Sequence, residues 1–498
     1  MQFLQFLQEW PLLSIVTFLP AVAGMLILLI PGDRRETIYK AALATGALVF
    51  LISLLVYLGF DVDGGRYQFI EQYNWLPQLG ISWYVAVDGI SAPLVLLTGI
   101  VMFTGVIISQ RIEERPREFF GFLFILATGV FGVFVALDMF ALFFFYEIAV
   151  FPMYLLIAIW GWKQTREYAA MKLTMYLFIG SVIALIGGLA MYFASGLGTF
   201  DMVALEGANF TREFQILWFP FVFIGFAVLG GIFPFHNWSP DGHVAAPTAV
   251  SMFHAGVLMK LGAFAALRVG IMLLPEGAKF HLPWMIFLTL VNVVYGAYIA
   301  MVQTDFKYVI GFSSVSHMGL VVMGFASLTP AGYIGAGVQM VSHGIMTALF
   351  FAVVGMIYDQ THTREIAKLG GMAQKMPFVM VAFVIGGLVS MGMPGLSGFV
   401  AEFPIFMGVW MSDKPWIAIV AAISIVITAA YIIRLIRRVF FGEFPAEFEG
   451  HVHDVRPSEK FALGLLALVL VLIGIFPGIM VPMVEAGVEH VFTLLGGM

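Results

Sequence analysis

The stretch FFFYEIAVFPMYLL, residues 143–156, decides the fold, because it places a single carboxylate, Glu147, in an otherwise uncharged and strongly apolar helix. Apolar runs of 18 or more residues with few charges are typical of membrane-spanning helices, and such runs recur along most of this chain. Of its 498 residues, 61% are hydrophobic and 11% are charged, whereas soluble domains carry about 25% charged residues. The sequence therefore predicts an all-α polytopic membrane protein.

The composition also excludes several classes of function. The chain has no cysteine, which excludes disulfides and cysteine-ligated zinc or iron–sulfur sites. A net charge of −6, spread over loops, gives no basic surface for nucleic acid. No glycine-rich phosphate-binding fingerprint or P-loop is present. We therefore expect no cofactor and no metal in this chain. The first apolar stretch lacks a preceding basic region, so we interpret it as a retained span and not as a signal peptide.

Fourteen spans fit the pattern of apolar runs. They are predicted at 12–31, 40–60, 88–109, 117–136, 139–160, 168–196, 215–236, 247–268, 283–303, 308–327, 331–358, 375–411, 415–440 and 460–483.

Two of these spans contain helix-breaking sequences. The seventh contains GGIFPFHNW (230–238) and the twelfth contains MGMPGLSGF (391–399). Gly and Pro within a span free backbone groups that protein or trapped water must satisfy. A pair of interrupted helices, one in each half of a transporter, is the best sequence indication of an ion pathway, although a single break can also be an ordinary kink.

The distribution of lysine and arginine predicts the orientation, since cytoplasmic loops are enriched in basic residues. Loops after even-numbered spans hold five basic residues, and only Lys172 and Lys260 lie within spans. Loops after odd-numbered spans hold the other 17: Arg34, Arg35, Lys40, Arg111, Arg115, Arg117, Lys163, Arg166, Lys307, Arg364, Lys368, Lys375, Arg434, Arg437, Arg438, Arg456 and Lys460. We therefore expect cytoplasmic odd-numbered loops and periplasmic termini.

Five ionisable residues share one approximate depth near the middle of five different spans. They are Glu147, Lys260, His317, His343 and Glu402. An acidic or basic side chain at a helix centre costs roughly 2.5–3.5 kcal/mol on insertion scales, so their recurrence favours a functional role. Linked by water, such groups can pass protons. Each of them alone could instead serve helix packing. Lys172 lies close enough to a helix end to snorkel, and Asp88 could simply complement a helix dipole.

Four stretches identify a resemblance to a known family. They are FPFHNWSPDGHVAAPTAVSMFHAGVLMKLGAF, QTDFKYVIGFSSVSHMG, VSHGIMTALFF and MPGLSGFVAEF. Over roughly residues 80–440 the chain resembles the antiporter-like subunits of proton-translocating NADH:quinone oxidoreductase (respiratory complex I), and in particular the M type, also called chain 4. The acid at Glu402 favours the M type, because the sister L and N types carry lysine there.

The resemblance implies 14 helices in which spans 4–8 and 9–13 form two inverted repeats, with helices 7 and 12 broken. The corresponding segments are 1–116, 117–274, 275–445 and 446–498, the last holding helix 14. It further implies that the midplane groups form a hydrated proton relay. The relay residues would be Glu147, Lys172, Lys260, His317, His343 and Glu402, supported by Asp88, Asp138, His236 and His254.

One position departs from the family pattern. The family has a lysine on broken helix 7 as partner of the acid at Glu147, whereas this chain has Leu229 in FAVLGGIFPFH. Either Lys172, one helix away, replaces that partner, which we favour, or the first half-channel is altered or idle.

The resemblance implies a non-redox subunit of a translocating oxidoreductase in the bacterial inner membrane. NADH, flavin and iron–sulfur centres would belong to partner subunits, quinone would be reduced elsewhere in the complex, and L-type and N-type neighbours would flank this chain. A subunit of a multi-subunit Na⁺/H⁺ antiporter, a ferredoxin-driven version of the complex and a membrane-arm spacer with impaired pumping are the alternatives.

A C-terminal reporter tests the predicted topology. Because basic residues favour the odd-numbered loops by 17 to five, a reporter that works only in the cytoplasm should be silent when it is fused after Met498. The same reporter inserted after Lys163 should be active. Activity of the C-terminal fusion would overturn the orientation.

Overall fold

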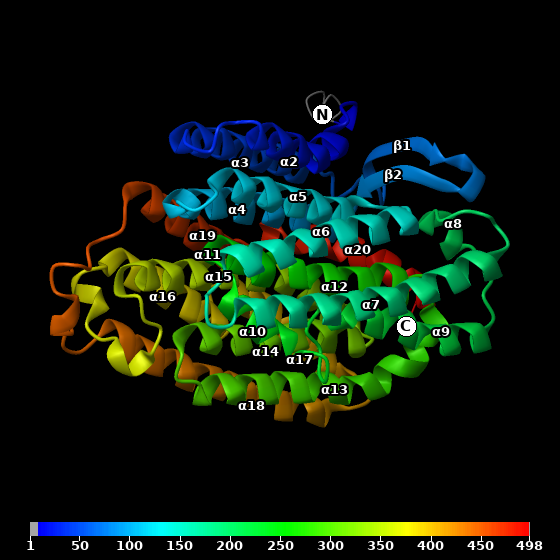
Figure 1. Ribbon diagram of the computed structural model, residues 1–498. Helices are drawn as coiled ribbons and strands as arrows, with labels where there is room; N and C mark the ends of the chain where they lie inside the picture. The colour runs from blue at the N-terminus through cyan, green and yellow to red at the C-terminus, as the bar shows by residue number, and fades with distance from the viewer. Residues whose placement is uncertain (1–7, 498) are drawn as a thin grey trace.

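Long apolar helices lie side by side along one common direction in the computed structural model, which describes residues 8–497 (Figure 1). The first elements are α2 (Leu12–Leu28), α3 (Arg35–Leu58), β1 (Gln68–Leu76), β2 (Ile81–Val87), α4 (Ser91–Ile108), α5 (Pro116–Val135) and α6 (Met139–Trp160). They are followed by α7 (Arg166–Ser195), α8 (Met202–Glu206), α9 (Arg212–Leu229), α10 (Trp238–Ala245), α11 (Thr248–Phe253), α12 (Met259–Ala265) and α13 (Pro275–Val302). The last are α14 (Phe306–Ala326), α15 (Pro330–Thr361), α16 (Pro377–Ser390), α17 (Ser397–Met411), α18 (Pro415–Leu435), α19 (Pro457–Ile475) and α20 (Val481–Leu494).

The predicted all-α membrane fold is confirmed. Among the described residues, 12 helices are long and apolar enough to cross a membrane, and three shorter apolar helices are Leu12–Leu28, Pro377–Ser390 and Ser397–Met411. These three coincide with predicted spans 1 and 12. The total of fourteen spans and the two inverted repeats stay predictions.

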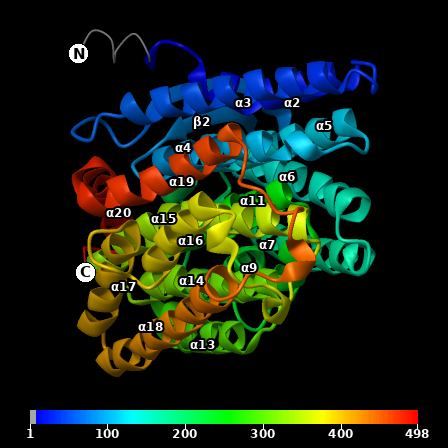
Figure 2. The same cartoon turned by 90° about the vertical axis from the view of Figure 1, so that its left-hand side faces the viewer.

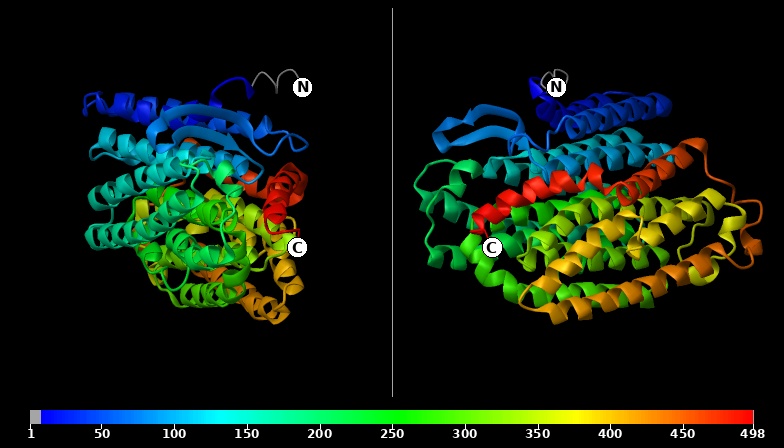
Figure 3. Two further views of the ribbon diagram at one scale, coloured as in Figure 1. Left: turned by 90° about the vertical axis from the view of Figure 1, so that its right-hand side faces the viewer. Right: turned by 180° about the vertical axis from the view of Figure 1, so that it is seen from behind.

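The helices divide into a buried centre and a lateral ring. Over an apolar stretch of 18 residues, every residue is buried in the continuous helical segment Thr248–Ile271 and in the helix Pro330–Thr361, whereas only 39% of the residues are buried in the corresponding stretches of Arg166–Ser195 and Pro415–Phe440. A helix that is apolar on all sides belongs inside a bundle, and the side views show the central helices enclosed by their neighbours (Figures 2 and 3). The lateral ring leaves apolar faces for lipid or partner chains.

Both predicted helix breaks are present. α9 ends at Leu229 and α10 begins at Trp238, and Gly231 lies between them with a φ of +70°. α16 ends at Ser390 and α17 begins at Ser397. Glycine tolerates positive φ without steric cost, so the glycines of these two stretches allow the chain to leave the helix and re-enter it inside the bundle.

One end of the bundle carries structure that the hydropathy pattern does not reveal. β1 and β2 pair as an antiparallel hairpin, which projects beside α8 in Figure 1. Span 14 was predicted to reach residue 483, but α19 ends at Ile475 and a separate helix, α20, begins at Val481. α20 passes so close to the start of α4 that a Cβ on Gly89 would lie 1.8 Å from the carbonyl oxygen of Met483. The predicted span was too long because the short turn around Pro477 is itself apolar.

Candidate functional site

Four side chains of the second half of the chain form one buried cluster. The Nδ1 of His317 (α14) lies 3.0 Å from a carboxylate oxygen of Glu402 (α17), which also accepts a hydrogen bond from Gln339 at 3.2 Å. The other ring nitrogen of His317 lies 3.0 Å from the hydroxyl of Ser390. All four residues are buried, with at most 4% of each exposed. Ser390 is the last residue before the helix break, so the break itself delivers a polar group to His317.

His343 extends this cluster towards the centre of the bundle. Its ring centroid lies 5.3 Å from that of His317, and its Nε2 lies 3.1 Å from the hydroxyl of Ser314. The Nδ1 of His343 is buried without a hydrogen-bond partner among the described residues. Buried polar atoms normally have a partner, which is often water.

The first half contributes a second cluster, in which two histidines are in direct contact. The Nδ1 atoms of His243 (α10) and His254 lie 3.0 Å apart, and the Nε2 of His243 lies 3.0 Å from the hydroxyl of Ser239. Lys260 is fully buried and donates a hydrogen bond to the carbonyl of Ala255 at 2.5 Å. Residues 254–258 form a π-helical turn. A single π turn inside an α-helix is frequent at functional sites.

The two clusters converge on the sulfur of one methionine, Met259. This thioether sulfur lies 3.6 Å from the hydroxyl of Ser239, 3.3 Å from Nε2 of His243 and 3.6 Å from the hydroxyl of Ser314. The two clusters thus approach each other at this sulfur, and all five of the predicted relay and supporting residues among them are buried: Lys260, His254, His343, His317 and Glu402. Of the ionisable residues in the two clusters, His243 was not predicted from the sequence.

The signal for His243 was present in the sequence but was weaker than for the other histidines. It follows the helix break by a few residues, in a stretch with Pro240 and Asp241 that reads as a loop. The sequence gave no signal for the uncharged polar residues of the two clusters, which are Ser239, Ser314, Gln339 and Ser390. Uncharged polar residues are common in spans, and only folding brings these four beside the ionisable groups.

Glu147 lies apart from these two clusters. Its side chain is exposed on the lateral surface of the chain, on the same helix face as Phe144 and Phe151, which are 41% and 67% exposed. Among residues 8–497, no lysine, arginine or histidine nitrogen forms an ion pair with its carboxylate. Leu229, at the position of the expected lysine, is fully buried in apolar packing.

The expectation that Lys172 replaces the missing lysine is wrong in this structure. The ammonium of Lys172 lies 2.7 Å from the carboxylate of Asp241, whose other oxygen accepts a hydrogen bond from Tyr308 at 3.0 Å. Helical geometry explains why the two side chains do not pair. Lys172 lies near one end of its helix, in the second turn of α7, whereas Glu147 lies further along its own helix, about 12 Å from the start of α6. Lys172 therefore pairs with Asp241 of α10, the short helix that follows the first break.

Two of the supporting residues have local roles. Asp138 accepts hydrogen bonds from the backbone N–H of Ala141 and of Ser82, at 3.0 and 2.9 Å, so it caps α6 and ties it to β2. Burial raises the pKa of Asp138, although these hydrogen bonds act in the opposite direction. His236 lies within the first helix break, where its buried ring nitrogens have no hydrogen-bond partner among the described residues.

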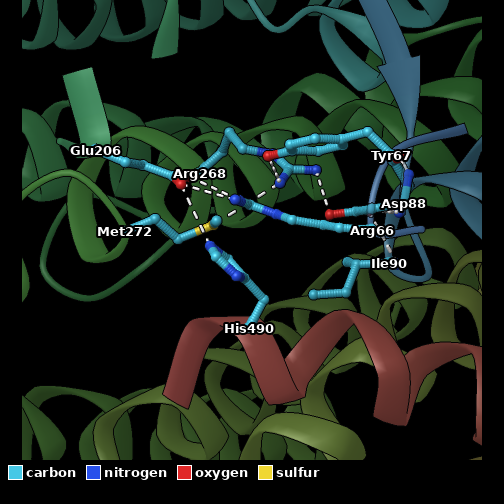
Figure 4. A network of polar contacts seen from close by, with 9 residues as sticks. Arg66, Tyr67, Asp88, Ile90, Glu206, Arg268, Met272 and His490 are labelled. Carbon is cyan, nitrogen blue, oxygen red and sulfur yellow. Dashed lines mark hydrogen bonds and ion pairs between the residues drawn. The ribbon is translucent and has the colours of Figure 1, made fainter. Parts of the chain in front are cut away.

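Asp88 belongs to an ionic network at the hairpin end of the bundle, drawn in Figure 4. Its carboxylate accepts hydrogen bonds from the backbone of Ile90 and Ser91, as expected for a helix start. It also pairs at 2.7 Å with Arg268, and both side chains are only 4% exposed. Burial opposes the ionisation of Asp88, but the guanidinium of Arg268 and the backbone hydrogen bond from Ser91 together outweigh it and hold the pKa of Asp88 below its ordinary value.

The same network includes the C-terminal helix. Arg66 donates two hydrogen bonds to the carboxylate of Glu206, at 2.7 and 2.5 Å, and His490 of α20 lies 3.2 Å from the same carboxylate. Burial opposes ionisation of Glu206, yet the hydrogen bonds from Arg66 and His490 lower its pKa overall. Burial raises the pKa of Tyr67, which accepts a hydrogen bond from Arg268, to about 12. This network joins five parts of the sequence, around residues 66, 88, 206, 268 and 490.

A cavity of about 470 Å³ opens at the opposite end of the bundle. Its lining includes Arg111, Trp162, Asp359, Arg364 and the buried Lys307. The ammonium of Lys307 donates a hydrogen bond at 2.6 Å to the carbonyl of Ala246, three residues from His243. The cavity lining also includes Val244, the residue after His243, but not His243 itself. Within residues 8–497, no group of three or more His, Asp or Glu side chains is arranged to hold a metal ion.

Comparison with known proteins defines the class of this chain. Residues 136–428 match the family model described as NADH:quinone oxidoreductase/Mrp antiporter, transmembrane. The chain is 37% identical over 478 residues to NAD(P)H-quinone oxidoreductase chain 4 3 of Trichormus variabilis, covering 94% of this chain and 89% of that protein. It is also 37% identical to chain 4 of Gloeobacter violaceus, covering 94% and 90%. The fold and the sequence thus define an antiporter-like membrane subunit.

Solved structures agree with this class. A chain of respiratory complex I from Thermus thermophilus with bound NADH is similar with a TM-score of 0.90 and 30% identity, covering 97% of this chain and 100% of that chain. A chain of the Mrp complex from Dietzia sp. shares the fold, with a TM-score of 0.85 at 18% identity, covering 97% and 100%. The protein belongs to the family of chain 4 subunits of NAD(P)H-quinone oxidoreductases.

Breaking the Asp88–Arg268 pair should destabilise the chain. We expect Asp88→Asn and Arg268→Met each to lower the free energy of unfolding by about 3–5 kcal/mol, because each leaves a buried group without its partner. The double variant should lose less than the sum of the two. Thermal unfolding in detergent measures this, with Arg35→Met as the control for an exposed ion pair.

The stability of the folded chain should decrease as the pH falls into the acidic range. Since the pKa of Asp88 is lower in the folded chain, its stabilisation is present above the unfolded-state pKa and is lost as the pH falls through the folded-state pKa. The Asp88→Asn variant should lack this acid-labile part. A parent-like stability of both single variants would contradict the role of the pair.

Proposed function

We propose that this chain translocates protons as a membrane-arm subunit of an NADH:quinone oxidoreductase, in which partner subunits carry out the redox chemistry. The observation that carries the proposal is the buried contact between His317 and Glu402 beside a helix break. A carboxylate and an imidazole in direct contact can exchange a proton. Placing both inside a membrane span is costly, and an apolar pair would pack the same space more stably.

A row of buried groups would extend this exchange through the bundle. Protons from the cavity near Lys307 would reach His243 and His254, then Lys260, His343 and His317, and leave by way of Glu402. Ring nitrogens of His254 and His343 on this path, and of His236 in the first helix break, are buried without a hydrogen-bond partner among the described residues, and such atoms are typically hydrogen-bonded to internal water. The direction of transfer follows from the predicted orientation, in which the cavity faces the cytoplasm.

Partner subunits would supply what this chain lacks. NADH, flavin, iron–sulfur clusters and the quinone site would lie in other subunits of the complex, coupled to this row through the membrane arm. The lateral face around Glu147 presents exposed aromatic side chains at mid-membrane depth, including Phe144 and Phe151, and this is a face that an L-type or N-type neighbour would cover. We place the complex in the bacterial inner membrane.

The Na⁺/H⁺ antiporter alternative has no observation of its own in its favour, because the family model covers both systems and the Mrp structure shares the fold alone. One observation does favour the alternative of a membrane-arm spacer. Leu229 and the unpaired Glu147 leave the first half without its expected ion pair, and this favours an altered first half with a working second half.

Neutralising the row should abolish pumping. We expect Glu402→Gln and Lys260→Met, each in the intact complex, to lower proton uptake per electron pair, because removing a positioned proton-transfer group slows transfer by roughly 10²–10⁴-fold. Inverted membrane vesicles with a pH-sensitive dye measure this. Glu449→Gln and Lys40→Met, both at exposed positions, are matched controls. If the row variants pump at the parent ratio, the relay is wrong.

Glu147 should contribute less than Glu402. Within residues 8–497 no cation pairs with its carboxylate, and a charged carboxylate without one is costly in a membrane, so we expect Glu147→Gln to retain most of the parent pumping ratio. The two Gln variants should be compared in the same vesicle assay, with subunit content checked by gel. A pumping loss in Glu147→Gln as large as in Glu402→Gln would show that a neighbouring subunit supplies the missing charge.

A further inference from the structure

The sulfur of Met259 lies at a point where the two buried clusters meet. Ser239 and His243 approach it from the first half, at 3.6 and 3.3 Å, and Ser314 approaches it from the second half at 3.6 Å. Among the described residues, no hydrogen bond joins His243 or Ser239 directly to Ser314 or His343. The two clusters therefore approach each other across the sulfur of Met259 without a direct hydrogen bond between these residues.

A thioether cannot relay a proton. Its sulfur is a weak hydrogen-bond acceptor and carries no exchangeable hydrogen, so it can accept from the two hydroxyls but can pass nothing on. A water oxygen at the same point would lie within about 3.3–3.6 Å of all three polar atoms, close enough to connect them after a small adjustment. The same three polar atoms would thus face sulfur in one state and water in another.

The first helix break provides the space into which the side chain of Met259 packs. Gly231 has a φ of +70°, and a Cβ there would lie 2.6 Å from the terminal methyl carbon of Met259. The glycine thus leaves room for the methyl group where the helix is interrupted. Methionine is unbranched and has three rotatable bonds, so it changes position more easily than any other large apolar residue.

We propose that Met259 is a movable gate between the two halves of the row. With its methyl group against Gly231, as in this structure, it closes the row. When the side chain rotates away, water connects His243 with Ser314 and His343, and a proton crosses. This inference rests on the proposed proton translocation and adds to it the point at which transfer is controlled.

Two substitutions at the same position separate a gate from a core residue that only fills space. Met259→Leu conserves volume but is stiffer and lacks the sulfur, so it should lower proton uptake per electron pair without a passive leak. Met259→Ala removes the plug, so it should lower the same ratio and also raise passive proton flux into substrate-free proteoliposomes of the whole complex. Met252→Leu, a fully buried methionine of α11 outside the row, is the control for repacking.

Gly231→Ala supplies an independent measurement, since the added methyl group displaces that of Met259. It should raise the passive flux as Met259→Ala does, and the double variant should leak no more than Met259→Ala alone. Assembly of the complex is checked for each variant by its subunit content and its rate of quinone reduction. If Gly231→Ala fails to assemble, the two Met259 variants alone still distinguish a gate from a residue that only fills space.

The outcomes distinguish the gate from the proposed function. Parent-like pumping and flux in both Met259 variants, with pumping lost in Glu402→Gln, would overturn the gate and leave the relay in place. Lower pumping in both variants without any leak would also overturn it, because Met259 would then only position its neighbours. Parent-like pumping in Glu402→Gln itself would overturn the proposed function.

Discussion

The constraint on which this structure depends is the cost of burying ionisable groups where water is scarce. A polar atom in such a place must find its partner within the protein, and nearly every feature of the centre of this chain meets that need. The central helices are enclosed, so that lysine, histidine and glutamate side chains face each other instead of lipid. Both helix breaks and the π turn at residues 254–258 provide backbone or side-chain partners beside these groups.

The two halves of the chain meet this constraint differently. In the second half, Glu402 has a histidine and an amide as neighbours, and the helix break delivers the hydroxyl of Ser390. In the first half, Leu229 fills the position of the expected lysine, and Lys172 is held by Asp241. This asymmetry supports the proposal that the second half carries the proton transfer.

Much of this architecture follows from the sequence because hydropathy and glycine–proline breaks are local signals. The two broken helices, the buried lysine and the midplane histidines were readable from single stretches. The partners were not, because they depend on which helix faces which. Lys172 and Asp241 are separated by 69 residues, and His243 appeared to lie in a loop. The hairpin and α20 were missed because neither is long and apolar enough to stand out among the spans.

The ionic network at the hairpin end has a consequence for how the chain is made. The contact between Glu206 and His490 cannot form until His490 has been synthesised. His490 lies 284 residues further along the chain, and at 5–20 residues per second the ribosome needs roughly 15–60 s to reach it. Asp88 likewise waits for Arg268 across 180 residues. During that interval the early helices are already inserted with incomplete charge pairs at one end. Biogenesis therefore leaves this end of the bundle unfinished until the last helix has emerged, and a chain truncated before α20 would keep the pair between Arg66 and Glu206 but lack the contact from His490.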